Sequence, residues 1–197
     1  MSFDASSRIN ATSIGEKVAV LSQFIAKDLD ARASGDTRLT SDTYLVIARS
    51  PDSPVIQALR THTATLGQLG IRVRAIFSEV EQGRAATVVR TAPFDGASEC
   101  RVARDPRLLA AHEQLVLSSD CSWTGDCMRR EPTKRDAYEC FSPSCAETAT
   151  IAARSFERLW RIASPVEQLA PLPGGMAPHL PDFINAVPPR PEVLRRQ

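Results

Sequence analysis

The chain has 197 residues, of which 43% are apolar, and this suits one ordinary domain with its own hydrophobic core. Its 24 basic and 23 acidic residues give a formal net charge of +1, so the chain as a whole is not attracted to nucleic acid or anionic lipid. We expect nucleic acid not to be a partner, and any basic surface to be local. No segment approaches the roughly 18 apolar residues of a membrane-spanning helix, and residues 1–11 have no signal-peptide core, so we expect a cytoplasmic protein without a membrane span.

The first half of the chain predicts a helix followed by a strand–helix–strand unit. Residues 13–33 show helical spacing of apolar residues, and Ser13 can cap the start of this helix. The continuous apolar run at residues 44–48 is typical of a strand buried on both faces. A helix of about five turns is expected to follow the turn at residues 50–54 and to end at Gly70, before a second strand at residues 71–77. Short connections of this kind indicate a parallel pair of strands.

The second half of the chain predicts shorter strands and one more helix. Strands are expected at residues 86–90, 100–103 and 114–117, and residues 122–124 can pair with the last of these through a turn at 118–120. Residues 129–137 are charged and loop-like, and prolines from Pro165 onward disfavour regular structure. A helix over residues 146–163 is expected to turn its apolar residues toward the core, namely Ile151, Phe156, Leu159, Trp160 and Ile162.

These elements divide the chain into an N-terminal helical extension (1–39), an α/β domain (40–163) and a proline-rich tail (164–197). We expect the two tryptophans, Trp123 and Trp160, to anchor the core of the α/β domain.

The segment from His112 to Arg130, HEQLVLSSDCSWTGDCMRR, resembles the signature of the phospholipase D superfamily. That signature begins with a histidine, has a lysine two residues later and an aspartate five residues after the lysine, and ends with a Gly-Ser pair near an asparagine. Here His112 takes the first position, Gly125-Asp126 approximates the pair, and the acidic Glu139 follows before the last helix. The resemblance covers roughly residues 40–163. It implies a phospholipase-D-like mixed sheet flanked by helices, in a single α/β domain.

The segment departs from the signature at the positions that carry charge. Gln114 stands in place of the lysine, and Asp126 brings a negative charge in place of the serine. Ser118 or Ser119 falls where the aspartate belongs, and the glycine comes one residue early, which implies a tighter hairpin. Losing one charged stabiliser of a developing oxyanion costs about 2.7–4 kcal/mol of transition-state energy.

The resemblance therefore predicts a non-catalytic or weakly catalytic binding or assembly module, acting as a homodimer on a phosphate-containing ligand without a cofactor. The residues expected to contact this ligand are Gln114, Ser119, Asp120, Gly125, Asp126, Arg129 and Arg130. Family active sites combine two copies of the motif, and this chain has one. The alternative is therefore a phosphodiesterase or nuclease formed by a homodimer, with paired His112 nucleophiles and replacement cations from Arg129 or Arg130. A third hypothesis is an α/β domain unrelated to the family.

Several of these residues also have simpler interpretations. His112 fits a structural histidine as well as a nucleophile. The thiols of Cys121, Cys127, Cys140 and Cys145 lack the close pairs of a zinc knuckle, so we expect free, buried cysteines rather than a metal site. The basic cluster Arg129, Arg130, Lys134 and Arg135 is either a solvated loop or a loop that binds an anion or a partner.

Overall fold

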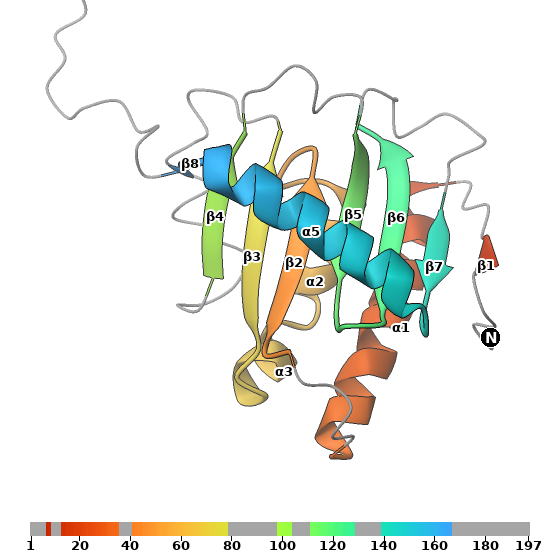
Figure 1. The fold of residues 1–197 in the computed structure, drawn as a ribbon. Coiled ribbons are helices and arrows are strands. Elements are labelled where there is room, and N and C mark those ends of the chain that lie inside the picture. Colours follow the sequence, from red (N-terminus) through yellow and green to blue (C-terminus); the bar gives the residue numbers. More distant parts are fainter. Residues whose placement is uncertain are drawn as a thin grey trace, which may run out of the picture.

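The computed structural model describes residues 7–8, 13–35, 41–78, 98–103, 111–128 and 139–166. Within these ranges the strands form one mixed sheet in the order β1–β7–β6–β5–β2–β3–β4–β8 (Figure 1). β2, β3 and β4 are parallel to one another, and every other neighbouring pair is antiparallel. The strands are β1 (Ser7–Arg8), β2 (Thr43–Ala48), β3 (Arg72–Phe77), β4 (Ser98–Val102), β5 (His112–Val116), β6 (Ser122–Cys127), β7 (Cys140–Ser142) and β8 (Ser164–Pro165).

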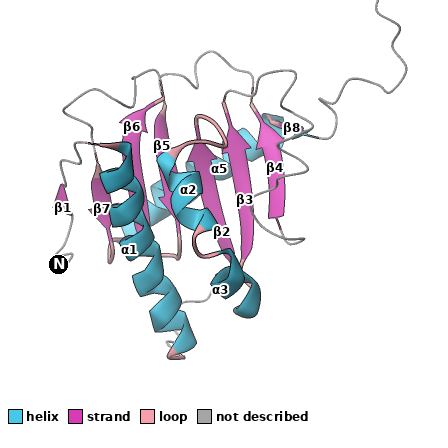
Figure 2. Ribbon diagram, turned by 180° about the vertical axis from the view of Figure 1, so that it is seen from behind, coloured by secondary structure: helices cyan, strands magenta, loops and turns pink. Residues whose placement is uncertain are grey.

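Helices cover both faces of this sheet, which confirms the expected single α/β domain with a mixed sheet flanked by helices. α1 (Ile14–Ala33) and α2 (Pro54–Arg60) pack on one face, and α3 (Thr63–Gln68) lies beside the start of β3 (Figure 2). α5 (Ala146–Ile162) crosses the opposite face diagonally (Figure 1). None of the described helices is long and apolar enough to cross a membrane.

α1 begins where the sequence predicts. The Ser13 hydroxyl accepts a hydrogen bond from the Glu16 amide, and the Glu16 carboxylate accepts one from the Ser13 amide, which forms a capping box. Leu21, Phe24 and Ile25 of this helix are buried in the same core as the sheet. The helix expected in the N-terminal extension therefore packs as part of the α/β domain.

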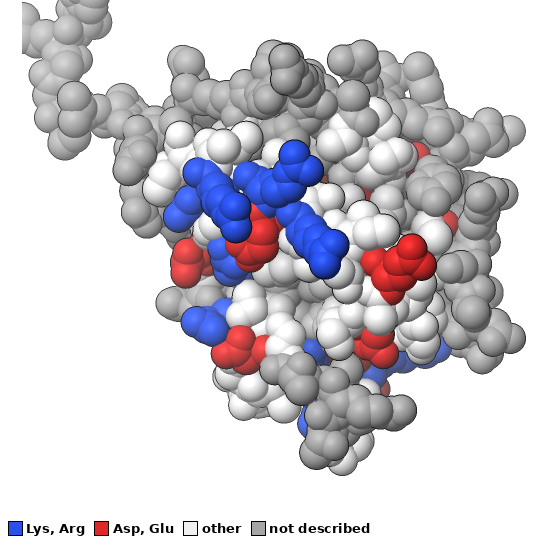
Figure 3. Space-filling view, viewed as in Figure 1, with Lys and Arg blue, Asp and Glu red and all other residues white. Residues whose placement is uncertain are grey.

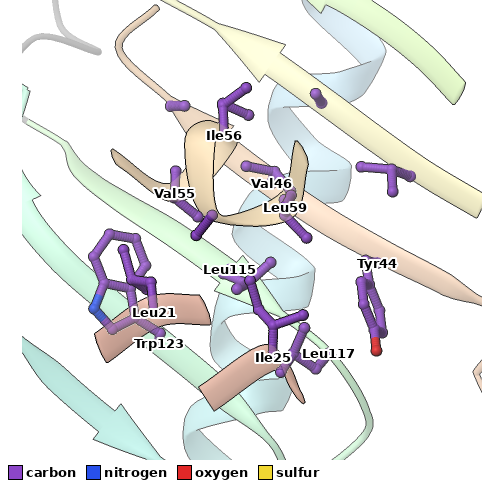
Figure 4. Close-up of a cluster of buried hydrophobic side chains, with 14 of the residues drawn as sticks. Leu21, Ile25, Tyr44, Val46, Val55, Ile56, Leu59, Leu115, Leu117 and Trp123 are labelled. Carbon is purple, nitrogen blue, oxygen red and sulfur yellow. The ribbon is translucent and has the colours of Figure 1, made fainter. Parts of the chain in front are cut away.

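Two hydrophobic cores lie on the two sides of the sheet. The larger one joins α1 and α2 to residues such as Tyr44 and Val46 of β2 and to Trp123 of β6 (Figure 4). The smaller one joins Ile47 of β2 to the face of α5 that carries Phe156 and Trp160. Because both faces of β2 are covered, its sequence is a continuous apolar run, as expected of a central strand. Trp123 and Trp160 are both buried, as predicted.

The helix expected from the turn at residues 50–54 to Gly70 is in fact two short helices, so the prediction of one five-turn helix was wrong. Thr61 donates its hydroxyl proton to the Ala58 carbonyl at 2.7 Å, and Thr63 donates to the Arg60 carbonyl at 2.9 Å. Such side-chain bonds offer backbone carbonyls an alternative to helical partners. The interruption places His62 at φ −109°, with Nε2 2.8 Å from Ser22 Oγ.

The prediction for α5 was wrong at two positions. Ile151 and Ile162 are 58% and 68% exposed, although both were expected to face the core. The buried stripe of the helix contains Ala149, Ala152, Phe156 and Trp160, which recur every three or four residues. The helix carries more apolar residues than this stripe can bury, and the two isoleucines are among those that lie outside it.

The hairpin of residues 114–117 and 122–124 is confirmed, and both strands are longer than predicted. The short strand at residues 100–103 is confirmed as β4, shifted slightly toward the N-terminus. Ser164–Pro165 pairs with the edge strand β4, a position where proline is tolerated in a sheet. The strand expected at residues 86–90, the loop at 129–137 and the tail beyond residue 166 lie outside the described residues.

Candidate functional site: a charged pocket at the end of β2

His112 lies at the start of β5, opposite Cys127 of β6, next to an irregularity in the pairing. Its side chain is exposed, and its Nδ1 lies 2.7 Å from the Gly125 carbonyl oxygen. Because a carbonyl oxygen only accepts hydrogen bonds, Nδ1 carries the proton. In the neutral imidazole the lone pair is therefore on Nε2.

The structure separates the residues that the motif brought together. Ser119 and Asp120 lie in the turn at the far end of β5 from His112. There the Ser118 hydroxyl donates to the Asp120 carboxylate at 2.8 Å, so these residues shape the turn. Arg129 and Arg130 lie outside the described part of the chain.

Gln114, which the resemblance was expected to place in a ligand site, lies on β5. Its Oε1 is buried and has no hydrogen-bond partner among the described residues. Leu115 and Leu117 belong to the larger core, and successive side chains of a strand point to opposite faces. Gln114 therefore lies on the α5 face of the sheet.

Gly125 lies inside strand β6 and not in a turn. A Cβ atom at this position would lie only 2.3 Å from Cζ2 of the Trp123 indole. The glycine is required because the indole ring lies against the backbone at this point.

A pocket of about 290 Å³ opens on the α1 side of the sheet, beside this hairpin. It lies at the carboxyl end of β2, which has a parallel neighbour on one side and an antiparallel neighbour on the other. Ligands of open α/β sheets commonly bind at the carboxyl ends of strands. The described lining comes from α1, the β2–α2 connection, the start of α2, β5, β6 and the residues just after β6 and just before β7, namely Ile14, Lys17, Arg49, Ser50, Asp52, Ser53, Pro54, Glu113, Trp123, Asp126, Cys127, Met128 and Glu139.

A buried lysine is at the centre of the charges in this pocket. Lys17 is only 5% exposed, and its Nζ lies 2.9 Å from Asp126 Oδ2 and 3.3 Å from Glu139 Oε1. The other oxygen of Glu139 accepts a hydrogen bond from the Trp123 indole at 2.6 Å. One ammonium group is thus shared by two carboxylates, and the network joins α1, β6 and the segment before β7.

Glu113 adds a third carboxyl group to the pocket lining near Lys17. Glu113 Oε1 accepts a hydrogen bond from the Arg49 amide at 2.9 Å. Burial raises the pKa of Glu113, and burial also raises the pKa of Glu139 against the opposing effect of Lys17. The described lining contains the four acidic residues Asp52, Glu113, Asp126 and Glu139 and the two basic residues Lys17 and Arg49, so its acidic groups outnumber its basic ones.

Sequence reasoning missed Lys17 as a site residue, although the sequence contains a signal for it. Lys17 falls between Ile14 and Leu21 on the apolar stripe of the predicted helix, where an amphipathic helix buries its side chains. A lysine at such a position needs a charged partner, because an unpaired buried charge is costly. Nothing in the local sequence identifies Asp126 and Glu139 as those partners.

The described cysteines are free thiols, but of the four expected to be buried only Cys121 is; Cys127, Cys140 and Cys145 are half-buried, so that part of the prediction was wrong. Among the described residues, no three His, Cys, Asp or Glu side chains form a group that could hold a metal ion.

The fold and this site define a mixed α/β domain with a pocket at the end of a central strand. No protein-family model matches the chain, and no curated protein matches it. The chain is similar to TrmBL2, an archaeal chromatin protein whose structure shows a novel mode of DNA binding, with a TM-score of 0.53 and 8% identity over 83% of this chain. It spans 55% of the TrmBL2 chain, and at this identity the likeness concerns the fold alone.

Two further solved structures have lower scores. Nuc from Salmonella typhimurium, a phospholipase D family member, has a TM-score of 0.46 and 13% identity, covering 72% of this chain and 89% of Nuc. NucT from Helicobacter pylori has a TM-score of 0.47 and 9% identity, covering 81% of this chain and 98% of NucT.

Proposed function

We propose that this chain is a non-catalytic binding module with a degenerate phospholipase-D-like motif, and that its pocket binds a small ligand carrying a positive charge. The observation that carries the proposal is the neutralisation of Lys17 by Asp126 and Glu139. With this ammonium already paired, the acidic groups of the described lining outnumber its basic ones, which favours a positively charged ligand.

The same charges argue against the phosphate-containing ligand that the motif implies. Phosphoryl transfer needs cations around the equatorial oxygens of the phosphate. At the motif positions the chain supplies the neutral amide of Gln114 and the carboxylate of Asp126 instead. A phosphate entering the pocket would meet the carboxylate of Asp126 and the carboxyl group of Glu113.

The apolar part of the lining suggests the shape of the ligand. Ile14, Pro54, Trp123 and Met128 supply apolar surface next to the carboxylates. A small organic cation, with an ammonium group on an aromatic or aliphatic body, matches both features.

Two measurements on the full chain test this proposal. In a thermal-shift titration, benzylamine should raise the melting temperature of the wild type, and inorganic phosphate should not. The effect of benzylamine should be weaker in Glu113→Gln and unchanged in Asp42→Asn, which alters an exposed carboxylate outside the pocket lining. Hydrolysis of bis(p-nitrophenyl) phosphate should not exceed the rate in buffer. Turnover that His112→Ala abolishes, or stabilisation by phosphate alone, would overturn the proposal.

A second candidate is a phosphodiesterase formed by a homodimer. It is favoured by the exposure of His112 and by the bond from its Nδ1 to the Gly125 carbonyl, which orients the imidazole ring. This candidate requires two His112 side chains in one site. It predicts that turnover rises with dimer formation in a sedimentation series, and that it disappears in His112→Ala.

A further inference from the structure

We propose that the outward face of α5, together with the groove beside it, docks an acidic segment of another protein that carries apolar side chains. Arg154, Arg158 and Arg161 are all exposed, and they lie on one side of the helix. At the rise of an α-helix the first and the last are about 10 Å apart along the axis. Figure 3 shows basic side chains gathered over this helix, on the face opposite to the pocket.

A groove runs beside these arginines. It has a volume of about 640 Å³ and lies between α5 and the turn that joins β5 to β6. Leu45, Ala149 and Ala153 give it apolar lining, and the three arginines belong to its wall. A segment lying in the groove would bury apolar side chains and place acidic ones next to guanidinium groups, which bind carboxylates in a bidentate geometry.

The two isoleucines that the sequence placed in the core extend this surface. Ile151 and Ile162 are 58% and 68% exposed, and they are eleven residues apart, close to three full turns of helix. Ile151 comes seven residues before Arg158 and Ile162 comes four residues after it, so both lie on the same outward side as that arginine. Large exposed apolar side chains next to arginine are typical of interaction surfaces.

The negative charge nearest to the arginines is already occupied. Glu157 pairs with Arg74 at 2.5 Å, and the Arg74 guanidinium stacks 4.2 Å from the centroid of Trp160. Glu157 also lines the groove, but its carboxylate is paired with Arg74, so the positive charge of the neighbouring arginines is left to attract an acidic partner.

The charges and the shape distinguish among partners. A second copy of α5 would bring three arginines against three, which disfavours self-association through this face. A single-stranded nucleic acid needs exposed aromatic rings for stacking, and the aromatic residues of α5, Phe156 and Trp160, are buried. Apolar lining next to arginines instead matches a polypeptide that presents both leucine-like and acidic side chains.

Fluorescence anisotropy with the full chain tests this inference, with a labelled peptide of alternating glutamate and leucine as the probe. The wild type should bind the peptide, and the affinity should fall as salt is added. The triple variant R154A R158A R161A should bind about tenfold more weakly, because three individually weak ion pairs are lost. The variant I151S I162S should also bind more weakly, with less effect on the salt dependence.

The controls separate a specific surface from general charge. R60A removes an arginine from the opposite side of the sheet and should bind like the wild type. The altered α5 residues are exposed, and circular dichroism should show an unchanged fold. The inference is overturned if the peptide does not bind, if the triple variant binds it equally well, or if random duplex DNA binds more tightly than the peptide and depends on the same arginines. None of these outcomes depends on the pocket or on His112.

Discussion

The ammonium of Lys17 lies 2.9 Å from the carboxylate of Asp126, although the two residues are 109 positions apart in the sequence. This ion pair joins the first helix to the β5–β6 hairpin. Both partners are largely buried, with side chains 5% and 13% exposed. Asp126 thus holds α1 against the sheet, and the shape of the pocket depends on that helix.

Replacement of Lys17 by methionine should destabilise the protein strongly. The substitution keeps most of the side-chain volume but leaves Asp126 and Glu139 as uncompensated buried charges, at a cost of about 3–5 kcal/mol. Urea unfolding measures the loss. Lys27→Met, at an exposed position of the same helix, is the matched control and should change stability by about 0.5 kcal/mol or less. Adding Asp126→Asn and Glu139→Gln to Lys17→Met should recover part of the loss, and no recovery would contradict this account.

Replacement of Gly125 by alanine should displace the Trp123 indole. The new Cβ would lie 2.3 Å from the ring, and overpacking of this kind typically costs about 1–3 kcal/mol. Tryptophan fluorescence should shift as the indole and its bond to Glu139 are disturbed. Gly67→Ala is the control, because nothing lies within 4 Å of the added methyl group in α3 and alanine favours helix. Equal stability of Gly125→Ala and the wild type would show that the ring can move freely.

The predicted elements that proved correct depend on local patterns. The apolar runs of β2 and β3, the cap at Ser13 and the β5–β6 hairpin can each be recognised within a dozen residues. The break between α2 and α3 could not be foreseen, because it depends on threonine hydroxyls that compete for backbone carbonyls and on the contact of His62 with Ser22 of α1.

The candidate site was less predictable because its residues meet only after folding. The motif pointed to Ser119 and Asp120, which the structure places in a turn at the other end of β5 from His112. The residues that line the pocket come from α1, the β2–α2 connection and the hairpin. The spacing of residues within one segment does not show which distant segments pack together. The helical pattern did, however, indicate that Lys17 is buried.

The stability of the protein should fall as the pH rises above the ordinary pKa of a glutamate. Burial raises the pKa of Glu113 above 4.5, so the folded protein holds its proton more tightly than the unfolded chain does. The stabilisation is complete below pH 4.5 and is lost as the pH rises through the folded-state pKa. The urea concentration at the midpoint of unfolding should fall with rising pH, and it should fall less steeply in Glu113→Gln than in the wild type. The slope should persist in part, because burial also raises the pKa of Glu139.

Cys145 should be the first of three cysteines, the others being Cys100 and Cys121, to react with iodoacetamide. Its Sγ lies 3.0 Å from the Thr148 hydroxyl at the start of α5, and hydrogen bonding from Thr148 lowers the pKa of the thiol. Burial raises the pKa of Cys100 to about 11 and of Cys121 to about 12. Since the thiolate is the reactive form, mass spectrometry should show Cys145 modified at least about tenfold faster than either. Thr148→Val should slow the modification of Cys145 and leave the modification rate of Cys121 unchanged. Equal modification rates of Cys145 and Cys121 in the folded wild type would contradict this prediction.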